Sequence, residues 1–494
     1  MVTDSRPMGV ALAASLLVGA GCYAAASPDG SGVGNDAETD EDAEPSEDVS
    51  SSGTEPAEDT SDGETASSSA DSDDDDDPSD ADDDDDPSGD EDPGEEEGDD
   101  DDVPDSDDDD DVPEELCAGP NKPKPCVGGE VEGYDCGNVE LLSITSTDEL
   151  GGGRVSDMWG WLHRDRRFAV IVHTNGTAFV EVTDPCNPVM LGMLPQSSSA
   201  NAIHHDPKVW DGWAFIVSEA QGHGMQVFDL RRLLDVASPQ AFEADAHYDG
   251  FGSAHNIVID EETGYGFAVG SGTCSGGLHM LDLHDPLSPT RVGCFSQAGY
   301  VHDAQCLIYR GPDTEHADKE ICVTFNGGSG KMSVVDVTDK SSPRELSRTG
   351  YPKAAYCHQG WFTSDLRYMF VGDELDEGDL VDRTRTLIFD MSDLDEPVLI
   401  GEHFGATRAT DHNQYVVGDR LYQANDGLGL QVFDTADVSG ANLTEVAYLD
   451  TLPGKDEGFD GLWSVYPFWP ESEVIGASDR NLGLVMVRIV PQVP

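Results

Sequence analysis

The chain has 494 residues and a formal net charge of −75, from 101 acidic and 26 basic residues. So large an excess of negative charge argues against nucleic acid and anionic membrane surfaces as partners. The length is sufficient for one large domain or for two or three ordinary ones.

An export signal is predicted at residues 1–22. Arg6 is followed by an apolar run at 8–21 that is too short to span a membrane. The segment VGAGC, which ends at Cys22, resembles a bacterial lipobox and predicts lipidation of Cys22, although Gly19 replaces the usual Leu. The run AAA at 24–26 offers ordinary signal peptidase a second site. We expect an exported lipoprotein of the outer membrane or cell surface, with a secreted or periplasmic form as the alternative and the lipid as its sole membrane contact.

The segment 23–115 is predicted to be a disordered linker. Residues 31–115 hold 43 of the acidic residues and no Lys or Arg, together with many Ser, Pro and Gly. Such a segment cannot bury enough apolar surface to offset its chain entropy, and its like charges keep it extended. We interpret it as a solvated spacer or tether.

Ten cysteines in an exported chain predict disulfides. A lead-in segment, 116–137, carries the first three after Cys22. Farther along, Cys306 and Cys322 are expected on neighbouring strands, and Cys274 and Cys294 fall within one repeat, so each of these two pairs is a candidate bridge. Nine cysteines remain once Cys22 is set aside, and Cys357 is the candidate for the unpaired one.

From residue 138 to 494 the sequence repeats. A short strand such as MQVFDLR (225–231) or MSVVDVT (332–338) recurs with its acidic position 44 to 54 residues apart. The aligned positions are Glu181, Asp229, Asp282, Asp336, Asp390, Asp434 and, as a departure, Arg488. Each unit holds four strand candidates, and seven such units predict an all-β, seven-bladed β-propeller. The last unit lacks its outer strand, which the segment 138–150 can supply, so that an N-terminal strand closes the ring.

The repeated strand resembles the LVIVD repeat, and SVVDVTDKSSP is its closest copy. Segments such as AHYDGFGSAHNIVIDEETG and HQGWFTSDLRYMFVGDELDE resemble the choice-of-anchor B family of exported bacterial proteins, over nearly all of the folded part. The resemblance implies a surface-anchored or secreted propeller without a defined activity.

A histidine recurs where the inner strands begin. The aligned residues are His205, His255, His302, His358 and His412, which are five of the fourteen histidines. Residues at one height on the innermost strands of a propeller form a ring at one mouth of its axis. We therefore expect these five side chains to lie together.

Loops between second and third strands should lie at the same mouth, because neighbouring strands are antiparallel. The polar residues predicted there are Glu219, His223, Asn326, Asp373, Glu374, Asp426 and Asp479. Their convergence with the histidines predicts a binding mouth. The acidic loop 372–379 is in addition a candidate calcium site.

Three interpretations of the histidines stay open. They are ligands of a divalent transition metal, structural ties between blades, or a polar recognition surface. The leading function is a surface-anchored binding module for a protein or glycan ligand. The alternatives are a metal-dependent hydrolase or oxidoreductase, with Glu219 or Asp373 as general base, and a structural surface component.

Overall fold

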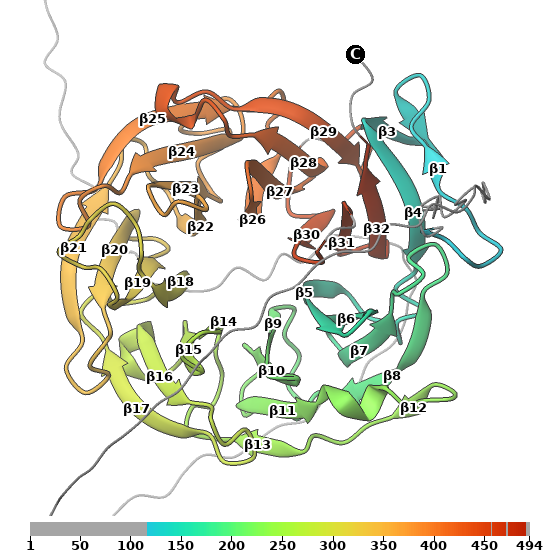
Figure 1. Ribbon diagram of the computed structural model, residues 1–494, viewed down its shortest axis with the longest axis horizontal. Helices are drawn as coiled ribbons and strands as arrows, with labels where there is room; N and C mark the ends of the chain where they lie inside the picture. The colour runs from blue at the N-terminus through green and yellow to red at the C-terminus, as the bar shows by residue number, and fades with distance from the viewer. Residues whose placement is uncertain (1–115, 456, 471–472, 491–494) are drawn as a thin grey trace, which may run out of the picture. The chain divides into compact units, whose positions relative to one another are not determined.

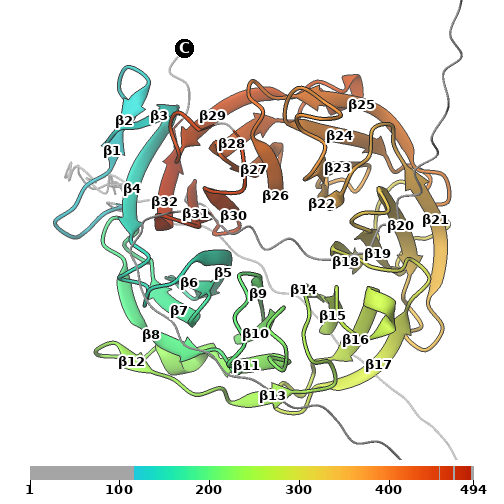
Figure 2. The same ribbon diagram turned by 180° about the vertical axis from the view of Figure 1, so that it is seen from behind.

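The computed structural model describes residues 116–455, 457–470 and 473–490. The predicted export signal, Cys22 and the acidic linker lie outside these residues. The described part forms seven antiparallel sheets around a common axis, which confirms the seven-bladed β-propeller (Figures 1 and 2). The first strand of each sheet is innermost, and successive first strands contact one another around the whole ring.

The first four blades follow one another directly in the sequence. Blade 1 contains β5 (Val155–His163), β6 (Arg166–His173), β7 (Gly176–Glu181) and β8 (Val189–Pro195), with β12 (Gln240–Ala241) added beside β8. Blade 2 contains β9 (His205–Trp210), β10 (Trp213–Ser218), β11 (Met225–Asp229) and β13 (Ala246–Tyr248). Blade 3 contains β14 (Asn256–Asp260), β15 (Tyr265–Val269), β16 (Leu278–Asp282) and β17 (Thr290–Phe295). Blade 4 contains β18 (Asp303–Ile308), β19 (Glu320–Phe325), β20 (Lys331–Asp336) and β21 (Arg344–Gly350).

Blades 6 and 7 take up the strands of the lead-in segment, whereas blade 5 is built from four consecutive strands. Blade 5 contains β22 (Cys357–Phe362), β23 (Tyr368–Asp373), β24 (Arg385–Asp390) and β25 (Val398–Phe404). Blade 6 contains β26 (Thr410–Val417), β27 (Arg420–Asp426), β28 (Gly429–Asp434) and β29 (Thr444–Asp450), extended by β3 (Tyr134–Gly137) and β2 (Glu130–Val131). Blade 7 contains β30 (Leu462–Tyr466), β31 (Val474–Asp479), β32 (Gly483–Ile489) and β4 (Val139–Thr145), with β1 (Lys124–Pro125) beside β4. Short 3-10 turns occur at η1 (Leu230–Leu233), η2 (Cys274–Gly276) and η3 (Val438–Gly440).

The core lies between blades. Both faces of a sheet pack against neighbours, so the second strands carry continuous apolar runs such as FAVIV at 168–172, all fully buried. Aromatic side chains join the layers, as where Phe179 of blade 1 stacks on Phe228 of blade 2 with ring centroids 4.5 Å apart.

The recurring aspartate of the third strand forms the turn that leaves it. In five blades the Oδ1 of this aspartate accepts a hydrogen bond, 2.8–3.1 Å long, from the backbone N–H two residues farther along the chain. The five accepting residues are Asp229, Asp282, Asp336, Asp390 and Asp434. This is an Asx turn, which explains the repeat chemically.

The two departures from aspartate make ion pairs instead. In blade 1 the carboxylate of Glu181 accepts from Arg166 at 2.8 and 2.9 Å. In blade 7 Arg488 donates its Nε to Glu140 of β4 at 2.8 Å. The predicted closing strand is thus tied to the last blade by a side-chain pair as well as by its backbone ladder.

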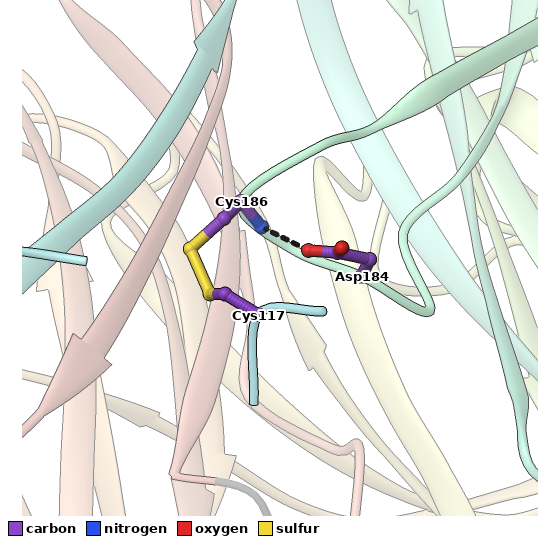
Figure 3. Close-up of side chains that lie close together, drawn as sticks. All are labelled: Cys117, Asp184 and Cys186. Carbon is purple, nitrogen blue, oxygen red and sulfur yellow. Dashed lines mark hydrogen bonds between the residues drawn. A yellow bond between two sulfur atoms is a disulfide. The ribbon is translucent and has the colours of Figure 1, made fainter. Parts of the chain in front are cut away.

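Disulfides hold the chain at four places in the described residues. The predicted bridges Cys306–Cys322 and Cys274–Cys294 are formed, and Cys357 is the buried free thiol. Two further bridges, Cys126–Cys136 and Cys117–Cys186, fix the lead-in segment, the latter beside Asp184 (Figure 3). Within the same described residues, no helix has the length and apolar character needed to cross a membrane.

Candidate metal centre

Five imidazoles and one indole form a closed circuit where the first strands begin. Successive ring centroids lie 5.2, 4.1, 4.2, 4.4, 4.8 and 5.2 Å apart, in the order His204, His255, His302, His358, His412, Trp463 and back to His204. Each member comes from a different blade, from blade 2 to blade 7. We call this circle of six residues the histidine ring.

Backbone irregularity sets the position of several members. In blades 3 and 4 the histidine immediately precedes the first strand, whereas His358 and His412 lie within β-bulges of β22 and β26. A bulge redirects a side chain that regular pairing would place on a sheet face.

His205 does not join the ring, contrary to the prediction, and His204 takes its place. The His205 ring instead packs beside His223, with centroids 5.7 Å apart, and its Nε2 lies 3.3 Å from the Ala202 carbonyl. The residue beside each histidine accounts for this difference. In blade 3 this residue is Gly270, and a Cβ on it would lie 2.5 Å from the Cβ of His255, so the glycine leaves His255 room. In blade 2 the residue paired with His205 is Ser218, which has a side chain.

Hydrogen bonds between blades hold most of the ring. The Nδ1–H of His302 donates to the His358 carbonyl at 3.0 Å, and that of His412 donates to the Trp463 carbonyl at 2.7 Å. Because a carbonyl can only accept, these bonds fix the tautomer and leave Nε2 with its lone pair. The structural interpretation from the sequence therefore holds for these Nδ1 atoms.

Glu219 holds the other two histidines. Its Oε1 lies 2.8 Å from Nδ1 of His255, and its Oε2 lies 3.0 Å from Nδ1 of His204. Although burial opposes ionisation, hydrogen bonds from the two imidazoles bring the pKa of Glu219 below its usual value. Because both of its oxygens are engaged by imidazoles, Glu219 is a poor general base.

His358 is the exception in the ring. Its side chain is 1% exposed, and neither ring nitrogen completes a hydrogen bond. The backbone of His412 is close enough to His358 to favour the protonated form of the His358 imidazole, but the two groups do not reach hydrogen-bonding geometry. Buried polar atoms are nearly always paired, so these two nitrogens call for an explanation.

A carboxylate lies next to this unpaired imidazole. Oε2 of Glu374 is 3.8 Å from Nε2 of His358, too far for a hydrogen bond. One donor atom from each of His302, His358 and Glu374 lies within 4.8 Å of the others. Two imidazoles and a carboxylate are a common ligand set for zinc and related ions.

The protonation states of the imidazoles suit a metal ion. Burial lowers the pKa values of His302, His358 and His412 well below the usual value, so these imidazoles are neutral, as metal ligands must be. Burial also raises the pKa of Glu374 to about 8, and Asp426 adds to this effect, so a cation bound near neutral pH would displace the proton of this carboxyl.

Arg480 lies against the ring, and it was not among the residues predicted for the mouth. It donates to Oδ2 of Asp426 at 3.0 Å, and its guanidinium lies 4.1 Å over the Trp463 ring. Asp426 is thus neutralised at this mouth, whereas Glu374 has no direct cationic partner among the ion pairs of the described residues.

The other residues predicted for the mouth stabilise loops instead. Asp373 accepts from Tyr351 and from the backbone of Ala355 and Tyr356 at 2.7–2.8 Å. Asn326, Asp479 and His223 likewise bond within their own blades. Loop geometry therefore separates Glu219, Glu374 and Asp426, which reach the mouth, from these four.

The acidic side chains of loop 372–379 do not converge on a common calcium site. Asp376 is paired with Arg385 in the interior, and Asp373 accepts from four donors. Among the described residues, this loop contributes only Glu374 to a group that could hold a metal ion.

In two other clusters of possible metal ligands, the ligand atoms are already engaged by other groups. Cys117 and Cys186 are joined in a disulfide, and Asp184 accepts from the backbone of Cys186 at 3.2 Å (Figure 3). His316 bonds Asp395 at 2.7 Å through Nε2 and accepts from Lys319 at 3.0 Å through Nδ1. Neither leaves a lone pair for an ion in the way that His358 does.

Fold and site together define a seven-bladed β-propeller with the histidine ring at one mouth of its axis. No known protein family matches the sequence, and no curated protein does so either. Among solved structures, a protein from Lactobacillus plantarum matches with a TM-score of 0.43 and 14% sequence identity, over 64% of this chain and 93% of that chain. The assignment of the fold rests on the seven sheets themselves.

Proposed function

We propose that this propeller binds a divalent transition-metal ion through His302, His358 and Glu374. The observation that carries the proposal is His358, whose two buried nitrogens have no hydrogen-bond partner while the partly buried carboxyl of Glu374 lies 3.8 Å from Nε2. A cation between them would satisfy Nε2 and the carboxylate. A bound ion of this kind supplies Lewis acidity to whatever oxygen or nitrogen reaches it.

A metal explains the ring better than direct recognition of a macromolecule. His302, His358 and His412 are all buried, so a protein or glycan partner would meet the rim of this mouth instead of the imidazoles. The two residues considered as general bases are both engaged, Glu219 by two histidines and Asp373 by four donors. The proposal is therefore metal binding, without a catalytic step.

The setting of the site is also part of the proposal. Disulfides in the described propeller are compatible with export to an oxidising compartment. Together with the lipobox-like segment at Cys22 and the LVIVD-like strands, they support an exported propeller of the choice-of-anchor B kind, displayed on an acidic tether.

Metal analysis of the full-length protein tests this function. Each protein is loaded with zinc and washed with a weak chelator. The wild-type protein should then retain one equivalent of zinc more than His358→Ala, and one equivalent more than Glu374→Gln. His284→Ala and Glu243→Gln are matched controls, because His284 is exposed and bonded only to its neighbour Asp282, and Glu243 is exposed. Equal retention in all five proteins would refute the proposal, since the metal would then be held by the acidic segment.

A further inference from the structure

A second site lies farther along the same inner strands. A cavity of about 490 Å³ is lined by residues of these strands. The lining begins at Asp303 and Gln359, which directly follow ring histidines, and continues to residues three or more positions along, such as Val258 in β14. At about 3.3 Å per residue, a position three residues along lies about 10 Å from the histidine, so the cavity extends away from the histidine ring along the strands.

One wall of this cavity is aromatic. It is built from Trp159 in β5, Trp361 in β22, Tyr415 in β26 and Tyr466 in β30, with Phe468 just beyond β30. The Phe468 ring lies 5.3–5.9 Å from each of the other four. Trp361 and Phe468 are partly exposed, so a ligand can reach the wall.

The charged residues of the lining are mostly acidic and stand among neutral ones such as Val258 and Leu307. They are Asp260, Glu261, Glu262 and Asp303 against a single cation, Lys208. The Lys208 ammonium is bonded to Asp206 at 2.5 Å, and Glu262 is paired with Arg310. Once these pairs are discounted, Asp260, Glu261 and Asp303 leave the cavity with an excess of negative charge.

The cavity therefore combines negative charge with aromatic rings. Electron-rich ring faces and nearby carboxylates attract cations, and together they recognise substituted ammonium groups in particular. An anion would meet no unpaired cation in this lining, because Lys208 is already held by Asp206. Lys208 itself lies 4.7 Å over the Trp159 ring, so one ammonium already uses this wall.

We propose that this pocket binds an organic ammonium cation against Trp361 and Phe468, with Glu261 and Asp303 supplying the counter-charge. This site differs from the metal centre in chemistry and adjoins it in position, because Asp303 and Gln359 directly follow His302 and His358. It is independent of the proposed metal function, because no residue is shared between the two sites.

Calorimetry of the full-length protein tests the proposal with three probes. They are choline, n-butylammonium, and 3,3-dimethylbutan-1-ol, which is the neutral carbon analogue of choline. At least one of the two cations should bind at millimolar concentration or better, and the neutral analogue should bind about tenfold more weakly or not at all. Failure of both cations, or equal binding of the neutral analogue, would overturn the proposal.

Paired substitutions locate the binding. Trp361→Leu and Glu261→Gln should each weaken it by about threefold to tenfold, while the controls Trp213→Leu and Glu243→Gln leave it unchanged. Glu261 is exposed, so Glu261→Gln should fold even if Trp361→Leu does not. Unchanged binding in Glu261→Gln together with any folded Trp361 variant would place the cation elsewhere.

The source of the ammonium group can be separated in the same assay. The acidic rim should repel the phosphate of a lipid headgroup, so phosphatidylcholine vesicles should not bind. Binding of vesicles without binding of the free cations would contradict the proposed charge complementarity.

Discussion

Nε2 of His358 lies 3.8 Å from Oε2 of Glu374, and neither nitrogen of that imidazole is hydrogen-bonded. The neighbouring members His302 and His412 each donate Nδ1–H to the next blade's carbonyl. One ring thus contains two kinds of histidine, those that tie blades together and one that does not.

This difference predicts opposite effects of the same substitution on stability. His358→Leu removes two buried unpaired nitrogens from the metal-free protein, so its free energy of unfolding should stay unchanged or rise by about 1 kcal/mol. His412→Leu leaves the Trp463 carbonyl without its donor and should lower the same quantity by about 2 kcal/mol. Denaturant unfolding in the presence of chelator measures both. A loss in His358→Leu as large as that in His412→Leu would show that His358 is also a structural tie.

The buried carboxyl of Asp303 predicts a pH dependence. Its folded pKa is raised to about 6 by burial, against about 3.9 in an unfolded chain. The folded state then binds the proton more tightly, so this group lowers stability as the pH rises from about 4 through 6.

Replacement by asparagine should remove this effect. Asp303→Asn keeps an oxygen for the Ala304 backbone N–H and should raise the free energy of unfolding near neutral pH by roughly 1 to 3 kcal/mol. The gain should vanish at about pH 4, where Asp303 is protonated in the folded state. A gain that is the same at both pH values would mean that the carboxyl does not titrate as described. The variant should also weaken binding of the ammonium cation near neutral pH.

The two lead-in disulfides should differ in their effect on stability. Cys117–Cys186 closes a separation of 69 residues, whereas Cys126–Cys136 closes one of 10. Restriction of the unfolded chain predicts a loss of about 4 kcal/mol for the double alanine variant of the first and about 3 kcal/mol for that of the second. Equilibrium unfolding of both variants gives the order. The reverse order would show that native contacts of the lead-in segment outweigh chain entropy.

Much of the architecture was predictable from the sequence because it repeats. The aligned position of the third strand forms an Asx turn in five blades and an ion pair in the other two, and its spacing located all seven blades. The missing outer strand of blade 7 pointed to the segment that holds β4. Cys306 and Cys322 were predicted as a bridge because they fall on neighbouring strands, and they lie directly opposite each other in β18 and β19.

The site was predictable only in part, because it depends on local backbone direction. Four of the five predicted histidines lie in the ring, but which of His204 and His205 faces the axis depends on the residue across from them. Asp373 and Glu374 are neighbours in one loop, yet one bonds the backbone and the other faces His358. The aromatic wall was missed because Trp159 and Tyr415 look like ordinary core residues in strands.

Cobalt(II) titration of the full-length protein tests the central claim most directly. Imidazole ligation gives visible ligand-field absorption that differs from binding to carboxylates alone, so the acidic segment does not interfere. The account predicts that wild-type protein and His284→Ala bind one equivalent with this absorption, and that His358→Leu and Glu374→Gln lose it. Absence of the imidazole-type spectrum from the wild type, or its persistence in both variants, would contradict a metal centre at His302, His358 and Glu374.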